Sequence, residues 1–217
     1  MQKIKKHCHL FSGLSNSEFA SIEKNAEIEK FTKWDFIVKQ WVLNKNLYII
    51  KKWIVKINFQ FKEKNFITWF LKKYDYFWEI WLFSWWISKV EAVCISPCEI
   101  IKIKQEDIDN LIINSPIFVY NLLNGFAEKI IKNQETIHNL AFRNVKDRII
   151  HQLIILAKIF RGKTDGKIIL DIPITQEELS HFIWTWRENV TKALAILKKE
   201  WIIDIKTKQI IVLDEKN

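Results

Sequence analysis

The sequence predicts an α+β fold, in which short strands fill residues 31–104 and helices dominate the rest of the chain. Several segments of the first half alternate apolar and polar residues, as half-buried strands do. A long run after Pro116 spaces its apolar residues by three and four, as a helix does. Two short helical patterns and a hairpin pattern close the chain, so strands and helices are largely segregated.

Composition limits the classes of protein to consider. The chain has 217 residues, of which 49% are hydrophobic, enough for one large domain or two small ones. The formal net charge of +9 suggests a polyanionic partner, although a basic soluble surface gives the same number. No apolar run approaches the ~18 residues of a membrane span, and the start lacks a signal-peptide core, so we expect a cytoplasmic protein without membrane contact.

The N-terminal elements come first. Residues 10–30 are typical of short helices, with Ser15 as N-cap and Glu18 three residues later in a capping box. Close strand spacing then predicts a small barrel or sandwich. The predicted strands are 36–38, 47–50, 54–59, 66–68 and 100–103.

The second half is mostly helical. Pro116 opens a helix that we expect to run to about Arg143. A second helix follows, and Gly162 is its expected C-cap. The remaining predicted elements are helix 145–160, strand 167–172, helices 176–182 and 187–199, and a hairpin of 202–205 with 209–213.

The two short helices have the layout of a helix-turn-helix. Thr175 and Glu178 form a second capping box, and a tight break falls at Trp184-Thr185. One apolar face of the second helix would pack inward, leaving its polar face free to enter a major groove. Two helices that merely pack, with solvated polar residues, would show the same pattern. The inward residues are Leu179, Phe182, Ile183, Val190, Leu194 and Leu197.

These segments resemble the CRP/FNR regulators over nearly the whole chain. The resemblance is carried by residues 175–179, 183–190 and 197–203 in the second half, and by 33–35, 47–50, 53–56 and 75–83 in the first. It implies a double-stranded β-helix (β-roll or jelly-roll) sensor like a cyclic-nucleotide-binding domain at 1–115, a dimerisation helix at 116–143 and a winged helix-turn-helix at 144–217. It further implies a homodimer that binds a palindromic site in double-stranded DNA, and RNA polymerase as a partner.

The resemblance also assigns roles on DNA. Thr175 would cap its helix and touch a phosphate, while Arg187, Glu188 and Lys192 correspond to the base-reading set. A cationic side chain such as Arg187 or Lys192 donates hydrogen bonds to guanine, and the Glu188 carboxylate accepts one from cytosine. Lys192 stands where the family usually has arginine, so a two-pronged contact is lost. The full expected DNA-binding set is Thr175, Gln176, Thr185, Arg187, Glu188, Asn189, Thr191 and Lys192.

The long helix carries a heptad-like seam of residues three and four apart. A helix buried within one chain has the same periodicity, but the resemblance favours a dimer contact, in which Asn133 would set the register. The seam consists of Leu123, Phe126, Ile130, Asn133, Ile137 and Leu140.

The expected effector pocket departs from the family pattern. Trp78-Glu79 matches the Gly-Glu pair that meets the ribose in cyclic-nucleotide binders, but Ser88-Lys89 stands where Arg-Ser meets the phosphate. Lys89 offers a positive charge but not two parallel hydrogen bonds, so the sequence disfavours a cyclic nucleotide. The effector stays unidentified.

No other cofactor is expected. An iron–sulfur cluster normally needs four thiolates, and the chain has three cysteines, of which Cys94 and Cys98 are expected to be buried. The trio His7-Cys8-His9 is a weak metal candidate, and we expect no metal site. No nucleophile–base pair indicates an enzyme. Two alternatives are a ligand-binding module and an enzyme regulatory subunit, both without DNA binding. The first leaves residues 175–192 unexplained, and the second predicts a catalytic partner and no salt-dependent DNA binding.

Tryptophan and glycine are out of balance. Four Gly and eleven Trp make fifteen residues, about the number of glycines that average usage of about 7% predicts. The family has glycine at six of the Trp positions and a small residue at Trp186, and Trp85-Trp86 falls at a hairpin where Gly-Gly is ordinary. We hypothesise that most or all of the eleven tryptophans are glycines in the living cell, because UGA codons, read as glycine by some bacteria, were translated as tryptophan. Tyr74, also at a family glycine, is a separate departure. The six positions are Trp34, Trp41, Trp53, Trp78, Trp184 and Trp201.

Overall fold

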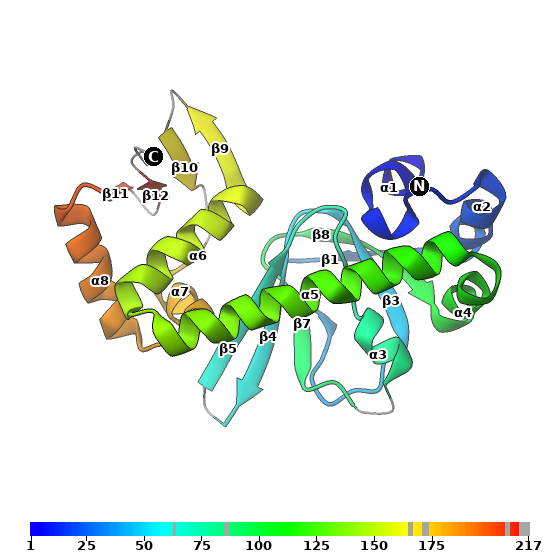
Figure 1. The fold of residues 1–217 in the computed structure, drawn as a ribbon, viewed down its shortest axis with the longest axis horizontal. Helices are drawn as coiled ribbons and strands as arrows, with labels where there is room; N and C mark the ends of the chain where they lie inside the picture. The colour runs from blue at the N-terminus through cyan, green and yellow to red at the C-terminus, as the bar shows by residue number, and fades with distance from the viewer. Residues whose placement is uncertain (63, 85–86, 165–166, 171–173, 207–208, 213–217) are drawn as a thin grey trace. The chain divides into compact units, whose positions relative to one another are not determined.

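The structure is a computed structural model that describes residues 1–62, 64–84, 87–164, 167–170, 174–206 and 209–212. The chain divides into two compact units, shown in Figure 1. The first comprises Met1–Gln60 and Leu71–Asn133, and the second comprises Phe61–Phe70 and Gln134–Asn217. Among the described residues, no helix is long and apolar enough to cross a membrane.

The first unit is built on a β-roll, as predicted. Together with β5, most of which falls in the second unit by this division, its strands form two four-stranded sheets, with the orders β1-β8-β3-β6 and β2-β7-β4-β5. The pairs β1–β8, β3–β8, β2–β7 and β4–β7 are antiparallel. The strands are β1 Glu27–Phe31, β2 Phe36–Val38, β3 Asn46–Lys52, β4 Val55–Phe61, β5 Lys64–Leu71, β6 Tyr76–Phe77, β7 Val90–Cys94 and β8 Cys98–Lys104.

Short helices flank the roll at the N-terminus. The Ser15 capping box forms as predicted: the Glu18 amide donates to Ser15 Oγ at 3.2 Å, and the Ser15 amide donates to Glu18 Oε2 at 2.7 Å. The prediction of helix up to residue 30 was wrong, because the chain turns into β1 after Asn25. Backbone pairing of β1 with β8 outweighs the local helical pattern. The helical elements are α1 Gln2–His7, a 3-10 turn His9–Phe11, and α2 Asn16–Asn25.

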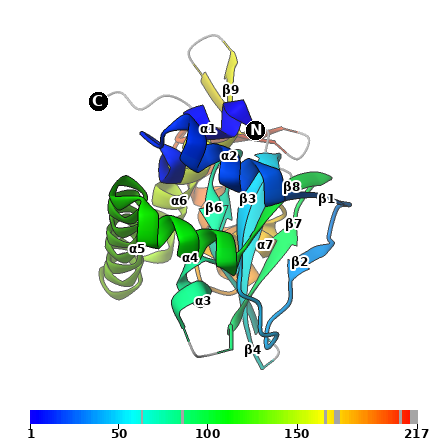
Figure 2. The ribbon, with the colours of Figure 1, turned by 90° about the vertical axis from the view of Figure 1, so that its right-hand side faces the viewer.

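The core of this unit joins the helices to the roll. Phe11, Phe19 and Phe118 are fully buried, and the ring of Phe11 lies 5.5 Å from that of Phe19 and 6.2 Å from that of Phe118. Helix α2 packs against α4, which spans Gln105–Asn114. Figure 2 views the roll from the side that carries both helices. The sequence pattern missed three helices, which are α1, α3 Glu79–Phe83 and α4 Gln105–Asn114. The long helix follows as α5 Pro116–Phe142.

The second unit is a winged helix-turn-helix. Its sheet has the order β11-β12-β10-β9, and helix α6 packs against α8. Gly162 is not a C-cap: it lies in β9, paired with Ile169, because α6 passes directly into a strand. Of the predicted strand 167–172, the structure describes only the part to Leu170. The elements are α6 Val145–Phe160, β9 Arg161–Thr164, β10 Lys167–Leu170, α7 Gln176–Phe182, α8 Arg187–Lys199, β11 Ile203–Lys206 and β12 Gln209–Val212.

Candidate DNA interface and effector pocket

Helix α7 is fixed at its start by the predicted capping box. The Glu178 amide donates to Thr175 Oγ1 at 3.1 Å, and the Thr175 amide donates to Glu178 Oε2 at 3.1 Å. Leu179 and Phe182 are buried beneath the helix. The cap leaves the remaining amides of the first turn pointing outward, where the helix dipole favours a phosphate.

A sharp turn then sets the direction of α8. Trp184 has a φ of 56°, and the Thr185 amide donates to the Ser180 carbonyl at 3.0 Å. The predicted apolar face of α8 is the buried one, with Val190, Leu194 and Leu197 each at most 2% exposed. Burial of this face against α6 and α7 fixes which side of α8 is turned outward.

The predicted DNA-binding residues are accessible to solvent. Thr185 is half-buried and all the others are exposed. Two hydrogen bonds tie them together: Thr191 Oγ1 donates to Gln176 Oε1 at 2.9 Å, and Asn189 Nδ2 donates to Thr185 Oγ1 at 3.2 Å. The exposed members are Thr175, Gln176, Arg187, Glu188, Asn189, Thr191 and Lys192.

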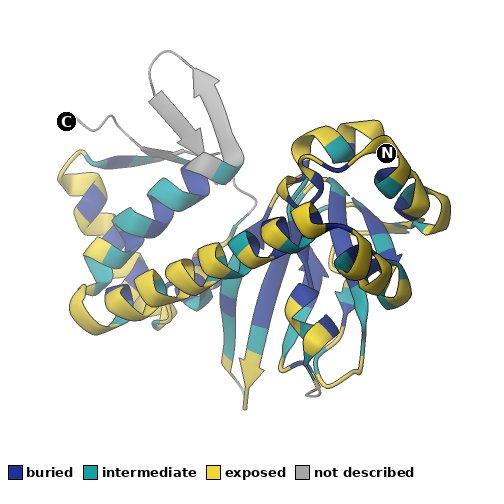
Figure 3. Ribbon diagram, turned by 45° about the vertical axis from the view of Figure 1, so that its right-hand side comes forward, coloured by how far each residue is buried: buried dark blue, intermediate teal, exposed yellow. Residues whose placement is uncertain are grey.

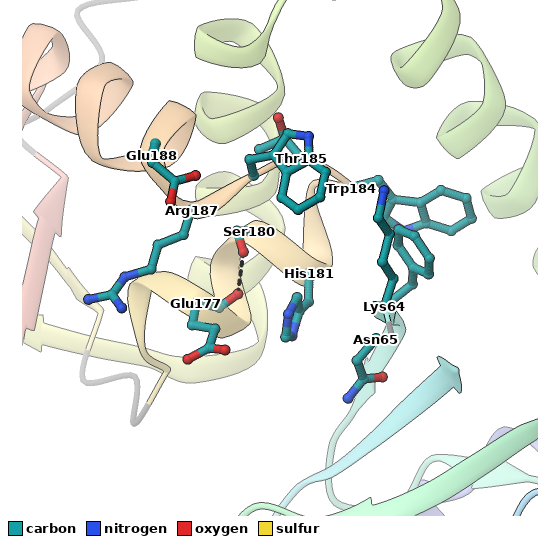
Figure 4. Close-up of a pocket in the computed structure, with 11 residues that line it drawn as sticks. Lys64, Asn65, Glu177, Ser180, His181, Trp184, Thr185, Arg187 and Glu188 are labelled. Atoms are coloured by element: carbon teal, nitrogen blue, oxygen red, sulfur yellow. Dashed lines mark hydrogen bonds between the residues drawn. The ribbon is translucent and has the colours of Figure 1, made fainter. Parts of the chain in front are cut away.

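A polar groove of about 360 Å³ opens beside the start of α8. Figure 4 shows Arg187, Glu188 and Glu177 around it, with His181 from α7. The Ser180 hydroxyl is held by the Glu177 carbonyl at 2.6 Å. Charged groups of both signs therefore surround the N-terminal end of the helix that the sequence assigns to base reading.

The seam on α5 is exposed within a single chain. Leu123, Ile130 and Ile137 are 59%, 58% and 66% exposed, and Figure 3 shows this helix turned largely to solvent. Asn133 is exposed, and Phe126 and Leu140 are half-buried. An intrachain core helix would hide these residues, so the exposure argues against that alternative. Apolar side chains at heptad spacing in solvent are typical of an unpaired dimer contact.

In the predicted effector pocket, Trp78 and Glu79 are 4% and 1% exposed. Trp78 Nε1 and Glu79 Oε2 have no hydrogen-bond partner. A third group, which the sequence did not predict, is Lys129 on α5, whose Nζ lies 2.5 Å from Glu79 Oε1. Burial lowers the pKa of the Lys129 ammonium, although the Glu79 carboxylate opposes the effect. Lys129 lies on the long helix α5, far from Glu79 in the sequence, so no local sequence pattern indicated that it belongs to the pocket.

The other two predicted pocket residues lie differently. Ser88 is buried, but its Oγ is engaged with Val90, donating to the carbonyl at 2.9 Å and accepting from the amide at 3.1 Å. Lys89 is exposed. The positive charge expected from Lys89 is therefore not buried with Glu79, where Lys129 supplies one instead.

The cysteines are buried, as predicted for Cys94 and Cys98. Cys8, Cys94 and Cys98 are at most 2% exposed. In the His7-Cys8-His9 trio, His7 is exposed and stacks on Tyr74 at 4.9 Å between ring centroids, while Cys8 points into the core. The trio therefore does not present its three side chains together. The hairpin predicted at Trp85-Trp86 lies outside the described residues.

Comparison with known proteins agrees with this geometry. The profile of the Crp-like helix-turn-helix domain matches residues 147–217. A CRP-like cAMP-activated global transcriptional regulator of Mycobacterium tuberculosis is 24% identical over 218 aligned positions, covering 100% of this chain and 97% of the relative. The cAMP-activated global transcriptional regulator CRP of Pasteurella multocida is 28% identical, covering 95% and 90%.

Solved structures share the fold. The c-di-GMP-responsive global regulator CLP of Xanthomonas campestris superposes with a TM-score of 0.81 at 16% identity, covering 92% of this chain and 100% of that one. A CRP/FNR-family transcriptional regulator of Thermus thermophilus gives 0.74 at 20% identity, covering 88% and 95%.

A β-roll, a long helix with an exposed apolar seam and a winged helix-turn-helix define a DNA-binding transcription regulator rather than an enzyme. Residues 147–217 match the Crp-like helix-turn-helix domain, and the relatives named above are CRP-like transcriptional regulators.

Proposed function

We propose that the chain acts as a homodimer that reads a palindromic DNA site with α8 and responds to an effector at the β-roll. The observation that supports the proposal is the exposure of the predicted contact residues of α7 and α8, together with the hydrogen bond between Thr191 and Gln176 that links the two helices. The proposed division of labour is a sensor at 1–115, a dimer helix at 116–143 and a DNA-binding domain at 144–217.

The contact residues divide into two kinds. Arg187, Glu188 and Lys192 read base edges, because charged side chains at one end of a recognition helix discriminate guanine and cytosine in the major groove. Thr175 positions the DNA backbone at the start of α7, where the capping box holds it. Thr191 is oriented by Gln176, so these two residues act together.

Dimerisation through α5 completes the site. Two copies related by a twofold axis present two α8 helices to half-sites about one helical turn, roughly 34 Å, apart. The exposed apolar residues of α5 supply the contact, and Asn133 fixes its register at some cost in stability. RNA polymerase is the partner that such a regulator contacts at a promoter.

The effector is proposed to be something other than a cyclic nucleotide. Relatives are named as cAMP-activated. In this chain the Ser88 hydroxyl is occupied by the backbone of Val90, and Lys89 is exposed, so neither is disposed to hold a phosphate. With only three cysteines in the chain, all of them buried, an iron–sulfur effector is not proposed either.

Selection from a random double-stranded DNA library tests the proposal. We expect the full chain to enrich an inverted repeat, with affinity that falls steeply as salt rises. A ligand-binding module or an enzyme regulatory subunit would enrich no motif. Light scattering on the same sample reports whether the binding species is a dimer.

A further inference from the structure

Six tryptophans hold a backbone conformation that suits glycine. Their φ angles lie between 56° and 79°. In this left-handed region the Cβ of an L-residue crowds the following carbonyl, and for a bulky residue it is a genuine outlier. Only two other non-glycine residues among those described share it, Lys62 and Tyr74. The six are Trp34 at 73°, Trp41 at 63°, Trp53 at 70°, Trp78 at 79°, Trp184 at 56° and Trp201 at 60°.

Side-chain burial does not offset this strain at five of them. The exposed fractions run from 37% at Trp184 to 81% at Trp201, with Trp41 and Trp53 both at 61%. An indole in water gains little from the hydrophobic effect, which would be the main reason to place one in a fold. Trp184 does make contacts, since its Nε1 donates to the Ile67 carbonyl at 3.4 Å and its ring centre lies 5.2 Å from that of Phe66. The Nζ atoms of Lys33 and Lys56 lie 4.9 and 4.7 Å from the Trp34 ring centre. Backbone and side chain thus disfavour tryptophan together.

Trp78, the sixth, is buried, but tryptophan is unfavourable there because of its hydrogen bonding. Its indole is buried, yet its Nε1 donor has no partner, and neither has Oε2 of the next residue, Glu79. Buried polar atoms are normally paired. A glycine here would satisfy the backbone and leave the interior space of the indole open beside a buried carboxylate.

We infer that the protein, as its own host makes it, carries glycine at these six positions. Members of the family that the sequence resembles have glycine at the same six positions. The backbone φ angle and the family pattern therefore select the same residues independently. Recoding of UGA accounts for all of them at once and leaves the four encoded glycines, among them Gly13 with its φ of 79°, unchanged. Tyr74 lies outside this explanation, and its ring is supported by stacking on His7.

The other described tryptophans do not have the positive φ angles that favour glycine. Trp69 in β5, Trp81 in α3 and Trp186, whose φ is −83°, have ordinary backbone conformations. At these three positions the backbone geometry alone does not select glycine. Trp85 and Trp86 lie outside the described residues.

Peptide mass spectrometry of protein purified from the organism that carries the gene tests the inference directly. Cleavage after lysine and arginine isolates several of these tryptophans in separate peptides, 34–39, 40–45, 53–56 and 200–206. We expect each peptide to have the mass of the glycine form and each of the six codons to be UGA. Peptides with indole masses, or UGG codons, would overturn the inference.

Recombinant variants test the physical argument separately. The six-glycine variant (Trp34→Gly, Trp41→Gly, Trp53→Gly, Trp78→Gly, Trp184→Gly and Trp201→Gly) should melt at a higher temperature than the printed chain. Trp53→Gly should raise the melting temperature more than Trp53→Ala, because both remove the indole but only glycine removes Cβ. Trp69→Gly, in a regular strand, should lower it. Equal effects of glycine and alanine at position 53 would contradict backbone strain as the cause.

Discussion

Lys129 on α5 and Glu79 at the start of α3 form a buried ion pair, with 2.5 Å between Nζ and Oε1. The Lys129 side chain is 14% exposed and that of Glu79 is 1% exposed. The Lys129 Nζ also lies 4.9 Å from the centre of the Tyr76 ring. The pair therefore joins the predicted effector pocket to the helix that carries the dimer seam.

Removing one partner of this ion pair should lower the free energy of unfolding substantially. Lys129→Met leaves the Glu79 charge buried without its partner, and we expect a loss of about 3–5 kcal/mol in the free energy of unfolding. The double variant Glu79→Gln with Lys129→Met should recover most of it. Urea unfolding of the single and double variants measures the coupling. Lys198→Met, at a surface pair 3.4 Å from Asp204, is the control and should cost less than about 1 kcal/mol. A loss at Lys129 no larger than this control would show that the pair contributes little.

Gly125 is required by the close approach of Tyr76. A Cβ at position 125 would lie 1.7 Å from the Tyr76 hydroxyl oxygen. Gly125→Ala should therefore lower the melting temperature, although alanine ordinarily stabilises a helix interior by about 1 kcal/mol relative to glycine. Adding Tyr76→Phe should restore part of the loss. A Gly125→Ala protein more stable than the parent would contradict the contact.

The α5 seam should govern oligomeric state. Phe126→Asp with Ile130→Asp places charge on the apolar face and should give monomers that no longer bind specific DNA. Glu128→Lys with Glu135→Lys changes charge at exposed positions outside the predicted seam and should leave the dimer intact. Light scattering distinguishes the two. A seam double variant that stays dimeric would rule out this interface.

Cyclic AMP should not bind tightly. Calorimetry with the printed chain and with Trp78→Gly should show no binding, or binding far weaker than in relatives that carry the Arg-Ser pair, because the phosphate site lacks an arginine fork. The Trp78→Gly variant is included because the indole could block the predicted pocket by its size alone. A low-micromolar dissociation constant for either protein would overturn the prediction.

Local patterns predicted those features that depend on neighbouring residues. Both capping boxes, at Ser15 and Thr175, form with the expected hydrogen bonds, because caps are local devices. The apolar faces of α7 and α8 are likewise as predicted. The strand spacing alone did not distinguish a barrel from a sandwich. The family resemblance predicted the β-roll.

Features set by distant residues were missed. Lys129 joins the Glu79 site across 50 residues of sequence. Strand β1 forms because β8 pairs with it, and Gly162 continues into a hairpin with β10. No local pattern contains such partners, so the sequence indicated a helix and a C-cap at these places.

The most direct test of the account is base-by-base DNA selection with single alanine variants of the recognition surface. The printed chain and the six-glycine variant are both measured against Arg187→Ala, Lys192→Ala and Thr175→Ala. We predict that Arg187→Ala relaxes the preference at one base pair of each half-site by about 1–3 kcal/mol. Thr175→Ala should instead weaken specific and random DNA alike. Equal losses on specific and random DNA for all three variants would contradict base reading by α8.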